Sequence, residues 1–270
     1  MKKNDLYSIS QFAKHTGIAR GTLIFYDDIG LFKPFARESN KYRYYSPTQL
    51  MTAKVLNALR DFGVPLKRII ELNEQRTPEI TLELLKEKQE EAEEAVRRAQ
   101  SVCRVISTFR KLIEHGRTVD EKIISIQESD EIPLTLGIVN DFQGSPYYFN
   151  AFLESRREFK ERGIDLNYPI GGYFNDMDTF LASPSRPSRF FSLDPAGGDK
   201  KKAGRYLIGY TIGSYGQVND LPERLAAYAK EHRLAFEGPV YNTYLLDEMS
   251  VMDHNNYLLE VDAGLATEMK

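Results

Sequence analysis

The sequence predicts an α+β protein with a small helical domain, one long helix and a mainly antiparallel sheet, in that order. Three observations support this prediction. Short amphipathic helical patterns separated by tight turns fill residues 5–75. Spacings of three and four alternate without a break through residues 79–116, as in a coiled coil. From residue 121 onwards the pattern changes to strand-like stretches with two inserted helices. We therefore expect three parts, residues 1–76, 77–118 and 119–270.

Composition indicates a folded protein outside the membrane. Hydrophobic residues make up 41% of the 270 residues, and no apolar run approaches the roughly 20 residues that a membrane span needs. The polar first residues do not look like a signal peptide, and the single cysteine, Cys103, excludes an internal disulfide framework. The four histidines are scattered without ligand spacing. We expect no metal, no other cofactor, no membrane partner and a cytoplasmic location.

Charge is unevenly distributed along the chain. Residues 1–80 carry 13 basic and 8 acidic residues, whereas the rest of the chain carries 23 basic and 31 acidic residues. A basic head on an acidic body favours contact of the head with a polyanion such as nucleic acid. Chance produces a similar imbalance in many stretches of this length, so charge alone leaves the partner open.

The N-terminal segment predicts two short helices joined by a tight turn. Ser8 and Gln11 form a capping box, in which the serine side chain accepts from the helix backbone and the glutamine reaches back. Gly17 ends this helix, and a second helix is expected from about Ala19 to Asp28. Such a pair is a helix-turn-helix candidate that places its second helix in the major groove of DNA, although many small helical domains share the pattern.

A hairpin and two further helices are expected next. Residues 35–45 alternate charge and tyrosine around Glu38–Asn40, which is typical of a hairpin wing. Residues 46–49 read as a second capping box with Pro47 at the first helical position, so we expect a helix to begin there. Pro65 begins a fourth helix.

The long helix carries a seam that needs a partner. Some 34 residues at 1.5 Å each give a rod of roughly 50 Å, which cannot bury its stripe against a small head. A second copy in an antiparallel coiled coil is the simplest partner, and packing on the C-terminal part of the same chain is the alternative. Cys103 lies on the seam, where we expect it to be a small buried apolar residue. The seam consists of Leu82, Leu85, Gln89, Ala92, Val96, Ala99, Cys103, Ile106, Arg110 and Ile113.

The C-terminal part repeats one order of elements, strand-helix-strand-strand, twice. Two such units commonly join into one antiparallel sheet with both helices on one face and a groove at the pseudo-symmetric seam. The expected strands are 122–127, 134–140, 168–174, 188–193, 205–212, 240–246 and 257–261, and the expected helices are 146–162 and 221–234.

Three sequence blocks in the head carry a family resemblance. Thr22–Pro34 reads TLIFYDDIGLFKP, Tyr42–Tyr45 reads YRYY, and Leu59–Ile69 reads LRDFGVPLKRI. In this order the blocks resemble the N-terminal signature of the MerR family of bacterial regulators, over about residues 6–75, and the long helix lies where that family has its dimer helix. The chain departs from the family pattern at Ile24, where an arginine is usual, and at Ala19 and Gly21, where a serine cap and often a basic residue are usual.

The MerR resemblance implies a function and a set of DNA contacts. It implies a homodimeric regulator, not an enzyme, that binds double-stranded promoter DNA together with RNA polymerase and distorts that DNA when a small-molecule effector is bound. Arginine at the start of the second helix suits a guanine edge, while wing side chains and tyrosine hydroxyls suit phosphates. For Tyr26, core packing is an equal alternative. The expected DNA-binding residues are Arg20, Gly21, Thr22, Tyr26, Lys33, Arg37, Lys41, Tyr42, Arg43 and Tyr44.

The C-terminal part resembles the GyrI-like effector domain of BmrR-type multidrug regulators. The resemblance rests on the order of elements, on Gly204–Tyr206 and Pro239–Tyr244, and on a last strand that starts at Tyr257. It implies a small aromatic or lipophilic effector, held by aromatic rings through stacking and cation–π contact. The expected effector-binding residues are Tyr147, Tyr148, Asn150, Tyr173, Tyr206, Asn242, Tyr244 and Tyr257.

Asn242 is the main departure from that second resemblance, because related domains have a cation-pairing glutamate there. A cationic effector would then need another acid, for which Asp176, Asp178 and Asp247 are candidates; otherwise the effector is neutral or zwitterionic. A neutral amide cannot act as a general base, which argues against a GyrI-like hydrolase. The remaining alternative is a drug-sequestering binding protein whose head domain serves autoregulation only.

Overall fold

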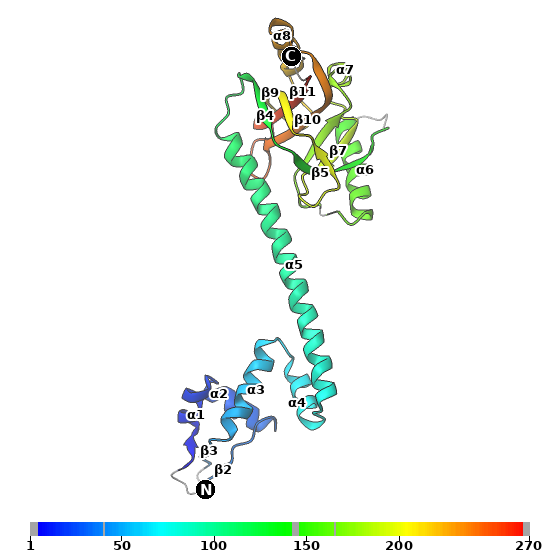
Figure 1. The fold of residues 1–270 in the computed structure, drawn as a ribbon. Helices are drawn as coiled ribbons and strands as arrows, with labels where there is room; N and C mark the ends of the chain where they lie inside the picture. The colour runs from blue at the N-terminus through cyan, green and yellow to red at the C-terminus, as the bar shows by residue number, and fades with distance from the viewer. Residues whose placement is uncertain (1–4, 40, 142–145, 165, 267–270) are drawn as a thin grey trace. The chain divides into compact units, whose positions relative to one another are not determined.

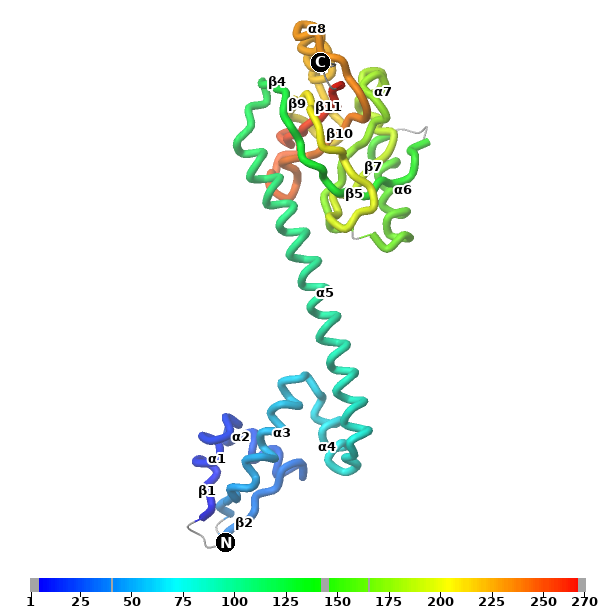
Figure 2. The backbone as a smooth tube through the Cα atoms, in the orientation of Figure 1, coloured from blue at the N-terminus to red at the C-terminus, as the bar shows by residue number. Residues whose placement is uncertain are grey.

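The computed structural model describes residues 5–39, 41–141, 146–164 and 166–266. The chain divides into two compact units, residues 1–98 and 99–270, and the helix expected over 77–118 is shared by both as α5 (Pro78–Gly116). Figure 1 shows the elements of each unit and Figure 2 the course of the backbone. Within the described residues, no helix is both long and apolar enough to cross a membrane.

The first unit is a helical domain with a small sheet. The strands pair antiparallel in the order β1-β3-β2, and the β2–β3 hairpin is the expected wing, with Ala36 opposite Tyr44 and Arg37 opposite Arg43. Its expected tip includes Asn40, which lies outside the described residues. The elements are β1 (Tyr7–Ser8), α1 (Ile9–Thr16), α2 (Arg20–Asp28), β2 (Ala36–Arg37), β3 (Arg43–Tyr45), α3 (Gln49–Asp61), α4 (Leu66–Glu74) and the first part of α5.

One of the two expected capping boxes is confirmed and the other is only half formed. Ser8 and Gln11 make both reciprocal contacts at the start of α1. At the second site α3 begins at Gln49, two residues later than expected. The Gln49 side chain still accepts from the Ser46 N–H at 3.0 Å, but the Ser46 hydroxyl pairs with Thr48 Oγ1 at 2.7 Å instead of with the helix backbone. Residues 46–48 therefore form a turn that precedes the helix.

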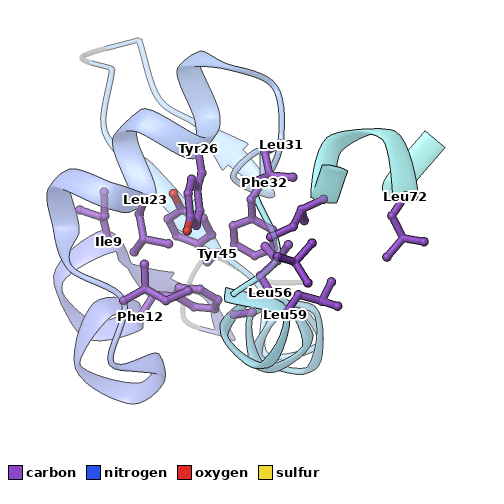
Figure 3. Close-up of a cluster of buried hydrophobic side chains, with 14 of the residues drawn as sticks. Ile9, Phe12, Leu23, Tyr26, Leu31, Phe32, Tyr45, Leu56, Leu59 and Leu72 are labelled. Atoms are coloured by element: carbon purple, nitrogen blue, oxygen red, sulfur yellow. The ribbon is translucent and has the colours of Figure 1, made fainter. Parts of the chain in front are cut away.

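Stacked aromatic rings form the centre of the head core (Figure 3). The ring centroids of Phe12 and Tyr45 lie 4.5 Å apart, and those of Phe32 and Tyr45 lie 5.7 Å apart. Leu23 of α2 is fully buried against this core. Leu84 of α5 is also buried in it, so the start of the long helix belongs structurally to the head.

The second unit is an eight-stranded antiparallel sheet in the order β4-β9-β11-β10-β6-β7-β5-β8. The expected duplication is confirmed, because β5-α6-β6-β7 and β9-α8-β10-β11 have the same order and meet where β6 pairs with β10. Helix α7 and strand β8 were not expected. The elements are β4 (Ile124–Ser129), β5 (Ile132–Val139), α6 (Tyr147–Glu161), β6 (Ile170–Phe174), α7 (Met177–Ala182), β7 (Arg189–Ser192), β8 (Asp199–Lys201), β9 (Gly204–Gly213), α8 (Leu221–Glu231), β10 (Phe236–Leu246), the 3-10 helix η2 (His254–Asn256) and β11 (Tyr257–Leu265).

The two faces of this sheet have different covers. Along β10, Val240 and Tyr244 pack in one core with residues of α7 and α8, whereas Tyr241 and Leu245 pack in another core with Leu112 of α5. This alternation is the two-residue period of a strand. Tyr148 of α6 packs against the first of these cores. The expected helices α6 and α8 therefore share one face of the sheet, and the C-terminal turns of α5 lie on the other.

The seam of α5 is uncovered in the single chain. Leu82 is 54% exposed, Val96 is 55% exposed and Ile106 is 59% exposed. Cys103, expected to be a small buried residue of the seam, is exposed in the single chain as well. Covering the stripe requires another surface.

Candidate DNA-binding surface and effector cavity

Helix α2 presents one face to the head core and the other to solvent. Gly17, in the left-handed conformation at φ 74°, ends α1 and allows the tight turn between the two helices. Leu23 and Tyr26 point into the core, whereas Arg20 and Phe25 are exposed. The burial of Tyr26, which is 6% exposed, argues against the expected phosphate contact, because the ring is enclosed by the core of its own domain.

Most of the other expected DNA-binding residues are accessible. Thr22, Arg43 and Tyr44 are half-buried. The exposed residues lie at the start of α2, in the segment after it and in the wing, and several of them are basic. One aromatic side chain among them, Tyr42, is 59% exposed. The exposed residues are Arg20, Gly21, Lys33, Arg37, Lys41 and Tyr42.

An ion-pair network that the sequence interpretation missed joins the wing to α2. Asp27 Oδ1 accepts from Arg37 Nη2 at 2.5 Å and Asp27 Oδ2 accepts from Arg43 Nε at 2.5 Å. Arg43 Nη2 also lies 3.1 Å from Asp28 Oδ1. The Asp27 side chain is fully buried. Burial alone would raise the pKa of Asp27, but the hydrogen bonds from Arg43 and Arg37 outweigh it and hold the pKa below its usual value.

This network gives Arg43 a structural partner that the prediction did not include. A phosphate at the wing would share Arg43 with two carboxylates, whereas Arg37 has a side chain that is 54% exposed. One signal in the sequence could have revealed the network. Acidic residues in the last turn of a helix face the negative end of its dipole, so Asp27 and Asp28 at the end of α2 needed cationic partners.

The second unit contains a cavity of about 260 Å³ lined mainly by aromatic rings. The centroids of Tyr215 and Tyr244 lie 4.7 Å apart with the rings nearly perpendicular, and those of Tyr148 and Tyr215 lie 6.2 Å apart with the rings nearly parallel. The Tyr244 hydroxyl accepts from the Gly216 N–H at 2.7 Å, which fixes the ring. The lining that matters here consists of Phe109, Tyr148, Phe152, Tyr168, Tyr215, Tyr244, Asp247 and Glu248. We call this space the aromatic cavity.

Two acids lie at the aromatic cavity. Burial raises the pKa of Asp247, although a hydrogen bond from the Met249 N–H at 2.9 Å partly opposes the rise. Burial also raises the pKa of Tyr215, and the hydrogen bond between Tyr215 and Glu248 adds to it. Arg156 also lines the cavity, with its guanidinium carbon 5.8 Å from the ring centroid of Phe152. Two carboxylates thus face one guanidinium among the ring faces, and this excess of negative charge is the chemistry that a lipophilic cation requires.

The eight expected effector-binding residues do not lie at one cavity. Tyr148 and Tyr244 line the aromatic cavity, and Tyr257 packs behind it, with its ring centroid 5.0 Å from that of Tyr215. Tyr173 and Tyr206 line a different cavity of about 680 Å³ together with Tyr241. Tyr244 and Tyr241 lie on opposite faces of β10, so the two cavities lie on opposite faces of that strand.

Asn242, Tyr147 and Asn150 line neither cavity. Asn242 is 4% exposed, and its Oδ1 accepts from the Gly172 N–H at 2.5 Å, so it serves the seam between β10 and β6. The Tyr147 hydroxyl donates to the Pro187 carbonyl at 3.3 Å. Asn150 donates from Nδ2 to the Pro146 carbonyl at 3.0 Å, within its own helix.

Sequence interpretation missed several residues of the aromatic cavity. Phe109 was assigned only to the long helix, Phe152 only to the apolar face of α6, and Glu248 was not considered. Asp247 had been named as an alternative acid, and it lines the cavity. Asp176, another candidate, accepts from the Thr179 N–H at 2.7 Å and caps α7 instead.

Comparisons with known proteins agree with this arrangement. Residues 7–75 match the family described as MerR HTH family regulatory protein. The Multidrug-efflux transporter 2 regulator of Bacillus subtilis (strain 168) is 29% identical over 255 residues, which cover 93% of each chain. The Multidrug-efflux transporter 1 regulator of the same organism is 34% identical over 68 residues, 25% of this chain and 24% of that protein.

Structural similarity to solved proteins is weak. The structure of EcmrR in a complex with DNA covers 97% of this chain and 100% of that chain, with 16% identity and a TM-score of 0.40. Because this score is low, the assignment depends on the sequence comparisons and on the geometry of the head. These define a DNA-binding helix-turn-helix protein. More specifically, its residues 7–75 match the MerR family of regulatory proteins, and the relatives that the chain matches along the sequence are described as regulators.

Proposed function

We propose that the protein is a homodimeric regulator that binds promoter DNA in the cytoplasm, acts with RNA polymerase at that promoter, and responds to a small aromatic or lipophilic effector. The observation that carries this proposal is the aromatic cavity with two carboxylates in the second unit. The relative that matches 93% of the chain is described as a regulator of a multidrug-efflux transporter, which supports the same chemistry for the effector.

A lipophilic cation suits the aromatic cavity better than a neutral compound. Each well-placed ring face contributes about 0.5–2 kcal/mol of cation–π attraction. Asp247 and Glu248 supply the negative charge that Asn242 lacks. A volume of about 260 Å³ is slightly below the usual range for drug-sized ligands, about 300–1,000 Å³, so an effector with several rings requires side chains of the cavity to move.

In the proposed mode of DNA binding, α2 enters the major groove and the wing lies along the backbone. Arg20 is exposed at the first position of α2 and is placed to bond a guanine edge. Lys33, Arg37 and Lys41 supply charge for phosphates. Distorting the promoter costs a few kcal/mol, which effector binding would help to offset by favouring one pose of the head domains.

Dimerisation follows from the uncovered stripe on α5. Leu82, Val96 and Ile106 of the seam are more than half exposed, and a self-complementary helix is the simplest surface that can cover them. An antiparallel pair of α5 helices would also give two heads for a two-fold operator.

A fluorescence titration tests the effector part of the proposal. The full chain is titrated with one cationic dye and one neutral analogue, and the double variant Asp247→Asn/Glu248→Gln is compared with Glu161→Gln, an exposed carboxylate at the end of α6 that lines no part of the cavity. We expect the double variant to bind the cation about ten- to a hundredfold more weakly, since a charge-assisted bond contributes about 1.5–3 kcal/mol, and to bind the neutral analogue as before.

The outcomes separate the alternatives. Equal affinity of the dye for the double variant and the unaltered protein would contradict the assignment of the cavity. Transcription in vitro from the cognate promoter should change when the dye is added. Binding of the dye without any change in transcription would instead support the sequestering alternative.

A further inference from the structure

The sheet face that carries the end of α5 contains another cavity, of about 380 Å³. Its apolar walls include Leu112 of α5, Leu134 of β5, Phe191 of β7 and Tyr241 of β10. The aromatic cavity shares none of these residues and is lined by Tyr244, which lies on the opposite face of β10. We call this second space the α5 cavity.

A buried ion pair forms part of the lining of the α5 cavity. Lys201 Nζ lies 2.7 Å from Asp262 Oδ2, and the two side chains are 8% and 6% exposed. Lys201 Nζ also lies 4.3 Å from the ring centroid of Tyr206. Glu260, two residues before Asp262 on β11 and also in the lining, is engaged by His115 Nε2 at 2.7 Å.

Asp262 keeps an unused acceptor in this environment. Its Oδ1 is buried and has no hydrogen-bond partner among the described residues. Buried carboxylate oxygens are nearly always bonded, so this atom indicates a missing donor. Burial raises the pKa of Asp262 above its usual value and the charge of Glu260 adds to the rise, since Lys201 offsets them only in part. A second cationic donor at Oδ1 would relieve both effects.

The charges around the α5 cavity are nearly balanced. Asp262 and Glu260 face Lys201 and His115. Lys111 of α5 also lines the cavity, but it is exposed, so water and salt screen its charge. The buried acceptor at this cavity that the described residues leave without a donor is therefore Asp262 Oδ1, while apolar side chains supply much of the remaining wall.

We propose that the α5 cavity binds a small amphipathic amine, whose ammonium group donates to Asp262 Oδ1 and whose apolar body lies against Leu112, Phe191 and Tyr241. This site is separate from the aromatic cavity and does not depend on the function proposed for it. Because Thr108 and Leu112 belong to α5, a bound amine adds contacts between the end of that helix and the sheet. The amine would act as a second ligand that stiffens the end of the helix.

Calorimetric titration of the full chain with phenethylamine tests the proposal, with the neutral phenethyl alcohol as the matched probe. We expect the amine to bind and the alcohol to bind at least tenfold more weakly. Asp262→Asn should weaken amine binding at least tenfold. Leu112→Trp, which fills the cavity from α5 and leaves the ion pair in place, should do the same. The double variant Asp247→Asn/Glu248→Gln should bind the amine as the unaltered protein does.

Hydrogen exchange on the same samples locates the ligand. Amine binding should increase protection of backbone amides in residues 108–112 and 257–265. No binding to the unaltered protein would overturn the proposal, as would equal affinities for amine and alcohol. If Asp262→Asn does not fold by circular dichroism, unchanged binding to a folded Leu112→Trp variant would overturn it. Loss of binding only in the Asp247→Asn/Glu248→Gln variant would place the amine in the aromatic cavity instead, whatever the fate of the proposed effector.

Discussion

Replacing Asp27 by asparagine should loosen the wing from α2. The carboxylate accepts from two arginines, and its side chain is fully buried. An amide offers one oxygen to Arg37 or Arg43 and presents its NH₂ group to the other, so one arginine loses its acceptor. A hydrogen bond to a charged group contributes about 1.5–3 kcal/mol. Because the Arg37 side chain is 54% exposed and can turn to water, we expect a loss of about 2–3 kcal/mol in the local stability of the head.

Native-state hydrogen exchange of the full chain measures this loss directly, because it reports local opening in a protein of two units. Amides of residues 36–45 and of the second half of α2 should lose about 30- to 150-fold of their protection, at 1.4 kcal/mol for each factor of ten. Glu71→Gln is the matched control. Glu71 pairs with Arg68 at 3.4 Å, with both side chains about half exposed, and such a pair contributes less than about 1 kcal/mol.

The same network sets a pH dependence with a definite sign. The pKa of Asp27 is lowered in the folded protein, so its contribution is present above the unfolded value of about 3.9 and is lost as pH falls through the lower, folded value. The Asp27→Asn variant has no carboxylate to protonate, so its stability should not show this part of the fall at low pH. If protection of the wing fell no further in Asp27→Asn than in Glu71→Gln, the network would not be what holds the wing.

Three further predictions concern DNA, assembly and the second unit. Arg20→Ala should relax sequence preference, whereas Lys41→Ala should weaken binding to all sequences and reduce the salt slope by about one; binding at several salt concentrations measures both, and a changed preferred site in Lys41→Ala would contradict these roles. A fragment of residues 1–88, which retains the buried Leu84, should sediment as a monomer, and a dimer would contradict the assignment of α5. The hydrogen bond that His115 donates to Glu260 raises the pKa of His115 although burial opposes it, so its contribution to stability is present below about pH 6.5 and is lost as pH rises through the folded value. An NMR titration of His115 with and without Glu260→Gln measures that shift, and an equal pKa in both would refute it.

Local patterns in the sequence were sufficient for the elements of the head and for the duplicated sheet. The box of Ser8 and Gln11, the glycine at position 17 and the two-residue period of β10 each depend on neighbours a few positions away. The spacing of apolar residues along the chain predicts whether a segment is a helix or a strand. The second capping box is incomplete for a local reason too. The Ser46 hydroxyl, expected to accept from the helix backbone, is hydrogen-bonded to the Thr48 hydroxyl instead.

Contacts between distant residues were decided only by the tertiary structure. Arg37 and Arg43 lie 10 and 16 positions from Asp27, and Lys201 lies 61 positions from Asp262. The spacing of these residues does not predict that they pair, because sheet register and chain reversal bring them together. The sequence predicted a phosphate contact for Arg43, but in the structure its guanidinium is already bonded to the Asp27 carboxylate.

The same reason explains why the expected effector residues were only partly placed at one cavity. An aromatic or polar residue on a strand can point to either face, and which face meets a cavity depends on the layers that cover it. Asn242 and Tyr244 share a face of β10, yet one bonds to the β6 backbone and the other lines the aromatic cavity. The sequence by itself therefore determined the kinds of side chain available to a site and the elements that carry them. Only the packing of helices on the two faces of the sheet decided which of those side chains meet, because a cavity forms where packed layers leave space.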